Sequence, residues 1–418
     1  MPEYRRGYLS DFFDGFAVKR LTAVEVDPTR SNQHEFQGVQ RLKEILGTPP
    51  DKVTFRSRFL WLDDDGDRTS ADGFLTWSDV RRNNPGRSAE YHLYYSAESA
   101  SVVHRASPGD MLLVCRQKNG DLLTVLTQAG GTIERQLSWL FDFSIDEDAR
   151  PLVRKLEPSG GREVGFAARF ILDELEIEAG QTDESFLDLL LENFGDTFPS
   201  TKVFSEFARN SLIDISPHDA PDEALLAWMD HEEKLFRTLE RYIVGKRLEI
   251  GFYDSSGPDV DGFIKYSLRV QNRRKARAGQ ALENHLETIF QAHDVRYSRG
   301  AKTEGNKKPD FIFPGAEEYH SPEVSPELLT ILGAKSSCKD RWRQVLTEAA
   351  RVETKHLLTL EPGISENQTA EMQESGLQLV IPKRLQDSYS PSQQDWLLDL
   401  GNFIELVQEK QRMTRDDS

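Results

Sequence analysis

Hydrophobic and polar positions alternate along the first 160 residues in the short-period pattern that is typical of β-strands. Four runs are rich in β-branched and aromatic residues, and turn-forming clusters such as "DDDGD", "NNPGR" and "KNGD" separate them. These runs are "KVTFRSRFLWL" (52–62), "EYHLYYS" (90–96), "MLLVCRQ" (111–117) and "LLTVLTQA" (122–129). The pattern predicts a mostly-β N-terminal domain over residues 1–160, of the small barrel or sandwich class.

The segment "EPSGGREVG" (157–165) breaks this pattern, and apolar residues recur at helical spacing after it. We therefore expect a linker over 161–183 and a second domain over 184–418, in which helices and strands alternate from about residue 258. Helices are expected over 184–194, 223–250, 273–293, 339–352, 366–375 and 393–409, and strands over 310–314, 328–337, 355–360 and 377–382. This alternation is typical of an α/β domain with a partly parallel sheet.

The composition narrows the class of protein. The 418 residues include 70 acidic and 52 basic side chains, and the net charge of −18 argues against a surface that binds polyanions non-specifically. The two cysteines, Cys115 and Cys338, cannot form a disulfide framework or a cysteine-rich zinc site. Because no apolar run approaches the length of a membrane span, we expect a soluble protein of the reducing cytoplasm with no membrane partner.

Candidate chemistry lies in the second domain. Asp310 begins one predicted strand, and Lys335 lies near the end of the next. If both residues lie at the same sheet edge, the carboxylate can hold a divalent cation, and the lysine can position a water or stabilise charge that develops on a phosphate. This arrangement is typical of a metal-dependent nuclease.

A hard cation needs further oxygen ligands. Glu348 lies on the predicted helix after Lys335, and Glu283 lies on the predicted helix before the "PD" dipeptide. Glu287 and Glu304 offer the same chemistry nearby, and the sequence alone does not separate the four.

Basic residues are concentrated in the same part of this acidic chain, in "RRKAR" (273–277), "NKK" (306–308) and "KDRWR" (339–343). Three such runs beside a carboxylate–lysine pair favour a cleft for a phosphate backbone. The tripeptide "KDR" also suits recognition of G·C pairs, because Lys and Arg donate to guanine and Asp accepts from cytosine.

The segment 272–382 resembles the catalytic domain of the EcoRII-type restriction endonucleases, within the PD-(D/E)xK nuclease superfamily. The resemblance rests on "RRKARAGQALENHLE", "TEGNKKPDFIFP" and "KSSCKDRWRQVLTEA", followed in order by "HLLTL" and "LQLVIP". It implies that Asp310 binds Mg²⁺ and that Lys335 is the catalytic lysine. The usual superfamily acid would stand at Gly333, and this family moves it to the following helix, which points to Glu348. Glu283 matches the family's upstream glutamate.

The resemblance also implies DNA contacts. The residues with which relatives read paired C·G steps correspond here to Lys339, Asp340 and Arg341. A second basic DNA-contacting element corresponds to Lys275 and Arg277. Met229 and Glu233 stand where some relatives carry an arginine and an aromatic residue that support flipped central bases, so the chain departs from the family there.

The N-terminal domain resembles the effector-binding pseudobarrel of the same enzymes in "KRLTAVEVDPTRSNQHEFQG" and "EYHLYYS". Candidate DNA contacts are Arg81, Arg82 and Arg87 in one loop and Asn32, Gln33 and His34 in another.

These observations favour a Mg²⁺-dependent type II restriction endonuclease. It would cut double-stranded DNA at a short, pseudo-palindromic site of the CC(A/T)GG type as a homodimer, with regulation by an effector site and a cytosine methyltransferase in the same system. One alternative is a two-domain DNA-binding regulator that has lost activity. The other is a methylation-dependent endonuclease whose N-terminal domain reads a modified base.

Overall fold

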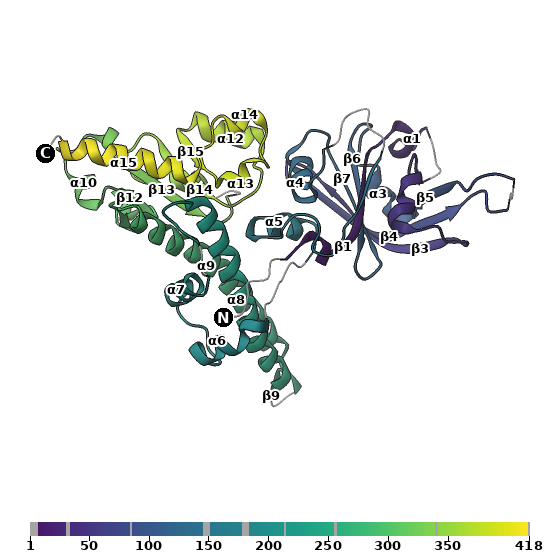
Figure 1. Cartoon of the computed structure of the whole chain (residues 1–418), viewed down its shortest axis with the longest axis horizontal. Helices are drawn as coiled ribbons and strands as arrows, with labels where there is room; N and C mark the ends of the chain where they lie inside the picture. Colours follow the sequence, from purple (N-terminus) through teal and green to yellow (C-terminus); the bar gives the residue numbers. More distant parts are fainter. Residues whose placement is uncertain are drawn as a thin grey trace.

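A computed structural model describes residues 7–30, 34–83, 86–144, 151–177, 184–212, 215–254, 257–338 and 342–416. Figure 1 shows a β-rich N-terminal part and an α/β C-terminal part, with a helix between them. Across the described ranges, no helix is long and apolar enough to span a membrane.

The N-terminal part is built on one eight-stranded sheet in the order β2-β5-β4-β3-β7-β6-β1-β8. Its strands are β1 (Phe13–Arg20), β2 (Glu35–Phe36), β3 (Val53–Leu62), β4 (Arg68–Asp79), β5 (Tyr91–Tyr95), β6 (Met111–Gln117), β7 (Leu122–Thr127) and β8 (Leu152–Lys155). Neighbouring strands are antiparallel except β3 and β7. The mostly-β prediction is confirmed, and the four expected strands correspond to β3, β5, β6 and β7.

Both faces of this curled sheet are buried. One face packs against short helices, including α1 (Ala23–Val26), α2 (Lys43–Leu46) and α3 (Ala100–Val103), around Phe59, Leu75 and Trp77. The other face packs on α4 (Thr132–Phe141) and α5 (Phe166–Glu174).

The expected linker over 161–183 is wrong in its first part, because that part contains α5. Ile171 and Leu172 of α5 are buried in a cluster that also includes residues of α4, α8 and the C-terminal sheet. The backbone N–H of Phe166 donates to the carboxylate of Asp230 on α8. Residues 178–183 lie outside the described part of the chain. The first part of the expected linker is therefore a packed helix that joins the two parts (Figure 1).

The C-terminal part combines two long helices with a five-stranded sheet. Helices α8 (Pro221–Ile250) and α9 (Val260–Ala292) pack against α6 (Leu187–Phe194) and α7 (Thr201–Ser211). The sheet has the order β11-β12-β13-β14-β15. Its strands are β11 (Ser298–Arg299), β12 (Phe311–Phe313), β13 (Thr330–Lys335), β14 (Lys355–Thr359) and β15 (Leu377–Val380). The last three strands are parallel, so the expected partly parallel sheet is confirmed.

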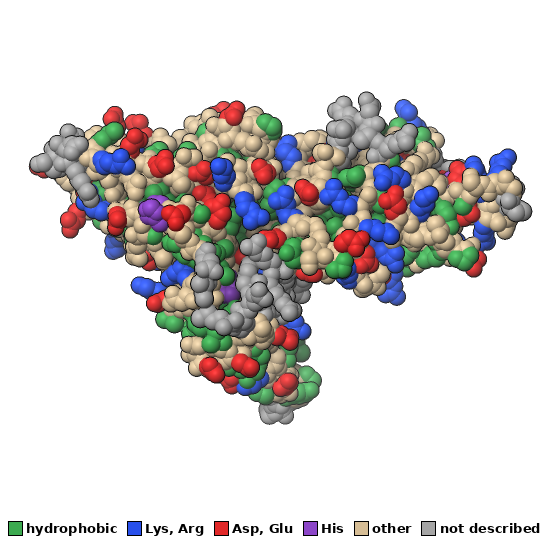
Figure 2. All heavy atoms as spheres, viewed as in Figure 1, with side chains coloured by type: hydrophobic (Ala, Val, Ile, Leu, Met, Phe, Trp, Pro, Cys, Tyr) green, Lys and Arg blue, Asp and Glu red, His purple; other side chains and the backbone are tan. Residues whose placement is uncertain are grey.

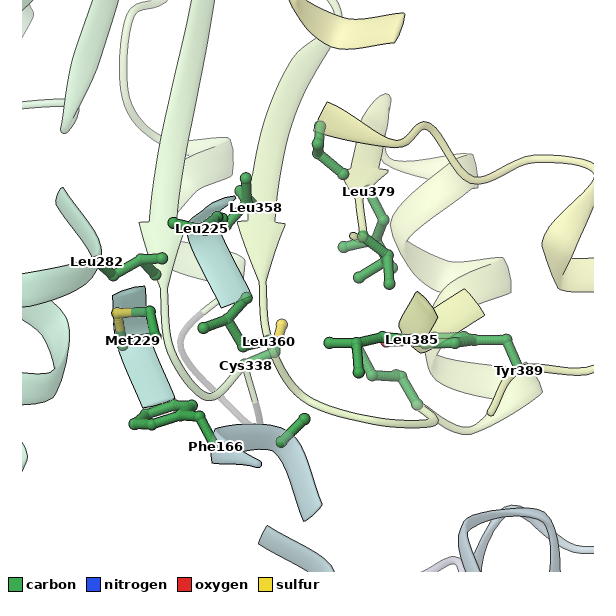
Figure 3. Close-up of a cluster of buried hydrophobic side chains, with 14 of the residues drawn as sticks. Phe166, Leu225, Met229, Leu282, Cys338, Leu358, Leu360, Leu379, Leu385 and Tyr389 are labelled. Carbon is green, nitrogen blue, oxygen red and sulfur yellow. The ribbon is translucent and has the colours of Figure 1, made fainter. Parts of the chain in front are cut away.

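The core reaches from α5 to this sheet without interruption. In Figure 3, Phe166 of α5 lies beside Met229 of α8, and Leu282 of α9 and Cys338 lie close to them. The sheet is covered further by α10 (Ala316–His320), α12 (Glu366–Glu374), α13 (Lys383–Gln386) and α15 (Leu400–Asp416).

Three predicted helices have different bounds. The helix expected over 273–293 begins earlier, because α9 starts at Val260. The helix expected over 393–409 is divided into α14 (Pro391–Gln394) and α15, because Leu398 forms a bridge with Val380 between them. The Asp222 carboxylate accepts the backbone N–H groups of Leu400 and Gly401, which fixes the start of α15. The helix expected over 339–352 is described only as α11 (Trp342–Leu346), so it ends at Leu346.

Candidate active site

Asp310 and Lys335 meet at one edge of the C-terminal sheet. Asp310 directly precedes β12, Lys335 ends β13, and these strands are antiparallel, so the start of one lies beside the end of the other. Lys335 Nζ lies 2.6 Å from Asp310 Oδ2, and the N–H of Ala334 donates to the same oxygen at 2.7 Å. The carboxylate is therefore fixed through one oxygen, while no described residue donates to Oδ1.

Glu348 lies close to this pair, but not on a helix as expected. It stands in the turn that follows α11. Its half-buried carboxylate forms no hydrogen bond or ion pair with any described residue. Burial raises the pKa of Glu348 to about 7, the charge of Asp310 contributes to this increase, and Lys335 and Lys307 act in the opposite direction. An acid with a raised pKa and no partner is typical of a functional site.

Packing explains why the acid does not stand on the strand. A Cβ atom at Gly333 would lie 2.8 Å from Cγ2 of Val345 on α11 and 3.4 Å from Cδ1 of Leu357 on β14. The first distance is shorter than any van der Waals contact, so a side chain at position 333 would force Val345 to shift. The turn after that helix brings Glu348 to the site instead.

The structure separates the other glutamates. Arg299 on β11 holds Glu283 through Nε at 3.2 Å and Nη2 at 3.0 Å. Burial and then the charge of Asp310 raise the pKa of Glu283, which therefore lies within the electrostatic reach of the site. Glu287 pairs with the same Arg299 at 2.9 Å. Glu304 instead accepts hydrogen bonds from Tyr319 and from the backbone. No motif in the sequence marks Arg299, which lies on β11.

The described residues contain no group of three or more His, Cys, Asp or Glu side chains arranged to hold a metal ion. The donor chemistry nevertheless fits a hard cation, because carboxylate oxygens are its preferred ligands. The charges of Asp310 and Glu348 repel each other, and a divalent cation held by the two carboxylates would offset that repulsion. Mg²⁺ keeps several waters in protein sites, so two carboxylates suffice as protein ligands.

The two residues of the expected second basic DNA element, Lys275 and Arg277, differ in their exposure to solvent. Lys275 is exposed on α9. Arg277 is only 7% exposed, and its guanidinium lies 4.6 Å from the ring of Phe204 and 4.7 Å from that of Phe236. It also pairs with buried Glu232 at 3.4 Å. Arg277 therefore packs within the helical part, and the expectation that it contacts DNA is not supported by this placement.

Lys339, Asp340 and Arg341 lie outside the described residues. The chain on either side of them is anchored. The N–H of Cys338 donates to Glu361 at 2.5 Å, and Trp342 is buried at the start of α11.

Two loops carry the expected N-terminal contacts. Arg81 is paired with Glu90, and Arg82 lies 3.6 Å from Asp51. Arg87 is exposed, with no partner among the described residues. On the face in Figure 2, basic and acidic side chains are interspersed over both parts of the molecule.

The second loop is described only from His34, because Asn32 and Gln33 lie outside the described residues. His34 stacks on Tyr95 with ring centroids 5.0 Å apart. Tyr95 ends β5, and the loop with the three arginines precedes the start of β5. His34 and the loop with the three arginines therefore lie at opposite ends of that strand.

A carboxylate–lysine pair at a sheet edge, with a second unpaired carboxylate beside it, is the arrangement expected of a nuclease.

Comparisons with known proteins agree. The "EcoRII C terminal" family model matches residues 236–404. "Type II restriction enzyme EcoRII" of Escherichia coli is 36% identical over 281 residues, which cover 67% of this chain and 67% of that enzyme. The chain belongs to the EcoRII family of type II restriction endonucleases, and it is thus an endonuclease that acts on DNA. The resemblance found in the sequence is confirmed.

Solved structures show weaker likeness. Metal-depleted Ecl18kI in complex with uncleaved, modified DNA is 18% identical with a TM-score of 0.45, covering 56% of this chain and 86% of that one. The restriction endonuclease PspGI–substrate DNA complex is 14% identical with a TM-score of 0.41, covering 53% of this chain and 94% of that one.

The raised pKa of Glu348 predicts a pH-dependent stability. A carboxyl group whose pKa rises from about 4.5 to about 7 on folding binds its proton more tightly in the folded state, so its contribution is lost as pH rises toward 7. In the presence of a chelator, Glu348→Gln should therefore have a higher Tm than wild type at pH 8, by roughly 1 °C for each 1 kcal/mol of stability in a chain of this length. The difference at pH 5 should be much smaller. Glu353→Gln, an exposed control, should show no such difference. Equal Tm values for wild type and Glu348→Gln at both pH values would contradict this assignment.

Proposed function

We propose that this endonuclease is Mg²⁺-dependent and cuts double-stranded DNA at a short G·C-rich, pseudo-palindromic site of the CC(A/T)GG type. The observation that carries the proposal is the Asp310–Lys335 ion pair with the unpaired carboxylate of Glu348 beside it. A symmetric site calls for a homodimer, because each subunit then serves one strand. A cytosine methyltransferase of the same specificity would protect the host DNA.

Each side chain has a distinct role in this mechanism. Asp310 and Glu348 would hold Mg²⁺, which supplies Lewis acidity toward the scissile phosphate when bound. Lys335 would orient the attacking water and stabilise negative charge on the phosphate. Glu283, held by Arg299, supports the site from α9. Water attacks in line with the leaving 3′ oxygen.

Recognition is assigned to the segment between β13 and α11. Arg341 and Lys339 would donate to guanine, and Asp340 would accept from cytosine. Lys275, exposed on α9, would contact the phosphate backbone.

Sequencing the ends of plasmid fragments tests the whole proposal. The purified full chain should cut unmethylated plasmid in Mg²⁺, with every fragment end at one CC(A/T)GG-type sequence, and should not cut in a chelator. Cleavage only of cytosine-methylated plasmid would instead support the methylation-dependent alternative, and ends at unrelated sequences would reject the assigned site.

Lys335→Ala and Asp310→Ala should each reduce single-turnover cleavage on the order of 10²–10³-fold or more, because each removes a group that acts on the charge-developing phosphate. Size-exclusion chromatography and thermal unfolding should show that both variants remain folded dimers. Cleavage at the wild-type rate by either variant would refute its role.

Glu348→Ala should lose cleavage to the same extent as Asp310→Ala. A side chain at position 333 would clash with Val345, which supports a ligand from the turn after α11. Glu353→Ala is the matched control, since Glu353 is an exposed glutamate five positions further along the same segment. Normal cleavage by Glu348→Ala in Mg²⁺ would show that the acid does not come from this turn.

We also propose that the N-terminal part binds a second DNA site and regulates cleavage. Two contacts support this. Gln136 on α4 donates to the carbonyl oxygens of Pro362 at 2.6 Å and Gly363 at 2.9 Å, in the loop that follows β14. Helix α5 also covers Met229 and Glu233 of α8, and Arg169 of α5 lies 3.5 Å from Glu233. Met229 and Glu233 are the positions that match the central-base residues of relatives. Effector DNA can open these contacts only by binding the open arrangement more tightly.

Truncation tests the regulation. A chain that begins at residue 181 lacks the sheet, α4 and α5, and it should cut single-site DNA faster than the full chain. An oligonucleotide that carries the site should stimulate only the full chain. A chain that begins at residue 163 keeps α5, so its rate shows whether α5 alone restrains cleavage. Regulation is rejected if the folded truncated chain is no faster and the isolated N-terminal part shows no duplex binding at low salt.

A further inference from the structure

The turn that carries Glu348 has a strained backbone. We define it as the 347–351 turn. Ala349, directly after Glu348, has a φ of 49° and is 1% exposed. A residue with a Cβ atom rarely adopts this left-handed conformation, and such strain persists only where the surrounding structure holds it. The contacts that hold this turn therefore bear on the position of Glu348.

Side chains from the segment before and after β12 provide these contacts. Glu304 Oε2 accepts the N–H of Ala350 at 3.2 Å, and the hydroxyl of Tyr319 donates to both oxygens of Glu304 at 2.8 and 2.7 Å. Lys307 Nζ donates to the carbonyl oxygen of Thr347 at 2.7 Å. Thr347 and Ala350 flank Glu348 and Ala349 in the turn. Both are thus hydrogen-bonded to the loop that contains Glu304 and Lys307.

The end of the turn is fixed to the same region. Arg351 donates to the carbonyl oxygens of Tyr319, of Ser321 at 2.8 Å and of Val324 at 2.7 Å. The buried ring of Tyr319 connects these bonds to Glu304.

Glu348 itself has no partner among the described residues, and the neighbouring charge of Asp310 repels its ionised form. Its position therefore depends on the backbone of the turn rather than on any bond of its own carboxylate. The backbone is strained at Ala349. It therefore keeps Glu348 in place against the repulsion from Asp310 only while Thr347 and Ala350 stay hydrogen-bonded to Lys307 and Glu304.

We propose that Glu304 is a positioning residue of the active site. Its carboxylate holds the 347–351 turn, with Tyr319 behind it, so that Glu348 faces Asp310. This inference rests on the proposed function, in which Glu348 is a metal ligand. It assigns to Glu304 a role different from those of the chemically equivalent Glu283 and Glu287.

Backbone exchange and metal dependence test the assignment in the full chain. Glu304→Ala removes both acceptors, whereas Glu304→Gln keeps one, and Glu317→Ala is a control at an exposed glutamate on α10. Hydrogen–deuterium exchange of the free protein should be faster across 347–351 in Glu304→Ala, and unchanged in the control. The Mg²⁺ concentration for half-maximal single-turnover cleavage should rise about 10–100-fold, as for other groups that support metal ligands. Glu304→Gln should lie between wild type and Glu304→Ala in both measurements.

Wild-type exchange across the turn together with wild-type Mg²⁺ dependence in Glu304→Ala would overturn the proposal. A lower Tm with unchanged Mg²⁺ dependence would also overturn it, because it would show a role in stability alone. If wild type itself shows no Mg²⁺-dependent cleavage, the proposed function fails. The exchange comparison then still decides whether Glu304 holds the turn.

Discussion

The ion pair between Asp310 and Lys335 is the interaction on which the rest of the catalytic part depends. It needs the antiparallel pairing of β12 and β13, because only that pairing places the start of one strand beside the end of the other. The Ala334 amide fixes the same carboxylate oxygen, so the acid is held by the sheet itself. The other elements are arranged around it: α9 brings Glu283, and the 347–351 turn brings Glu348.

The two parts of the molecule are less separate than the sequence suggests. A single buried cluster runs from the N-terminal sheet through α5 to the C-terminal sheet. Opening the molecule for DNA would expose apolar side chains of α5 and α8, such as Leu172 and Met229, and exposure of such surface is unfavourable in water. Under the proposed regulation, effector DNA would have to offset that cost through its own binding.

Much of the site could be predicted from the sequence, because Asp310 and Lys335 occupy fixed positions at the ends of short apolar strands. The setting of Glu348 could not. The residues around it favour a helix locally, but Glu304 bonds to the backbone of the turn and Arg351 bonds the end of the turn to the segment after β12. Glu304 and that segment are distant in sequence from Glu348. For the same reason the burial of Arg277 was missed: it belongs to a basic run, and its aromatic neighbours come from other helices.

The absence of a side chain at Gly333 also has an evolutionary consequence. An ancestor with its acid on the strand would need space that Val345 now fills. Regaining that acid in one mutation would disrupt the packing of α11 before any metal ligand was gained. A smaller residue at position 345 would therefore have to accompany any acid at position 333. The two positions are coupled by packing, so they are expected to change together or not at all.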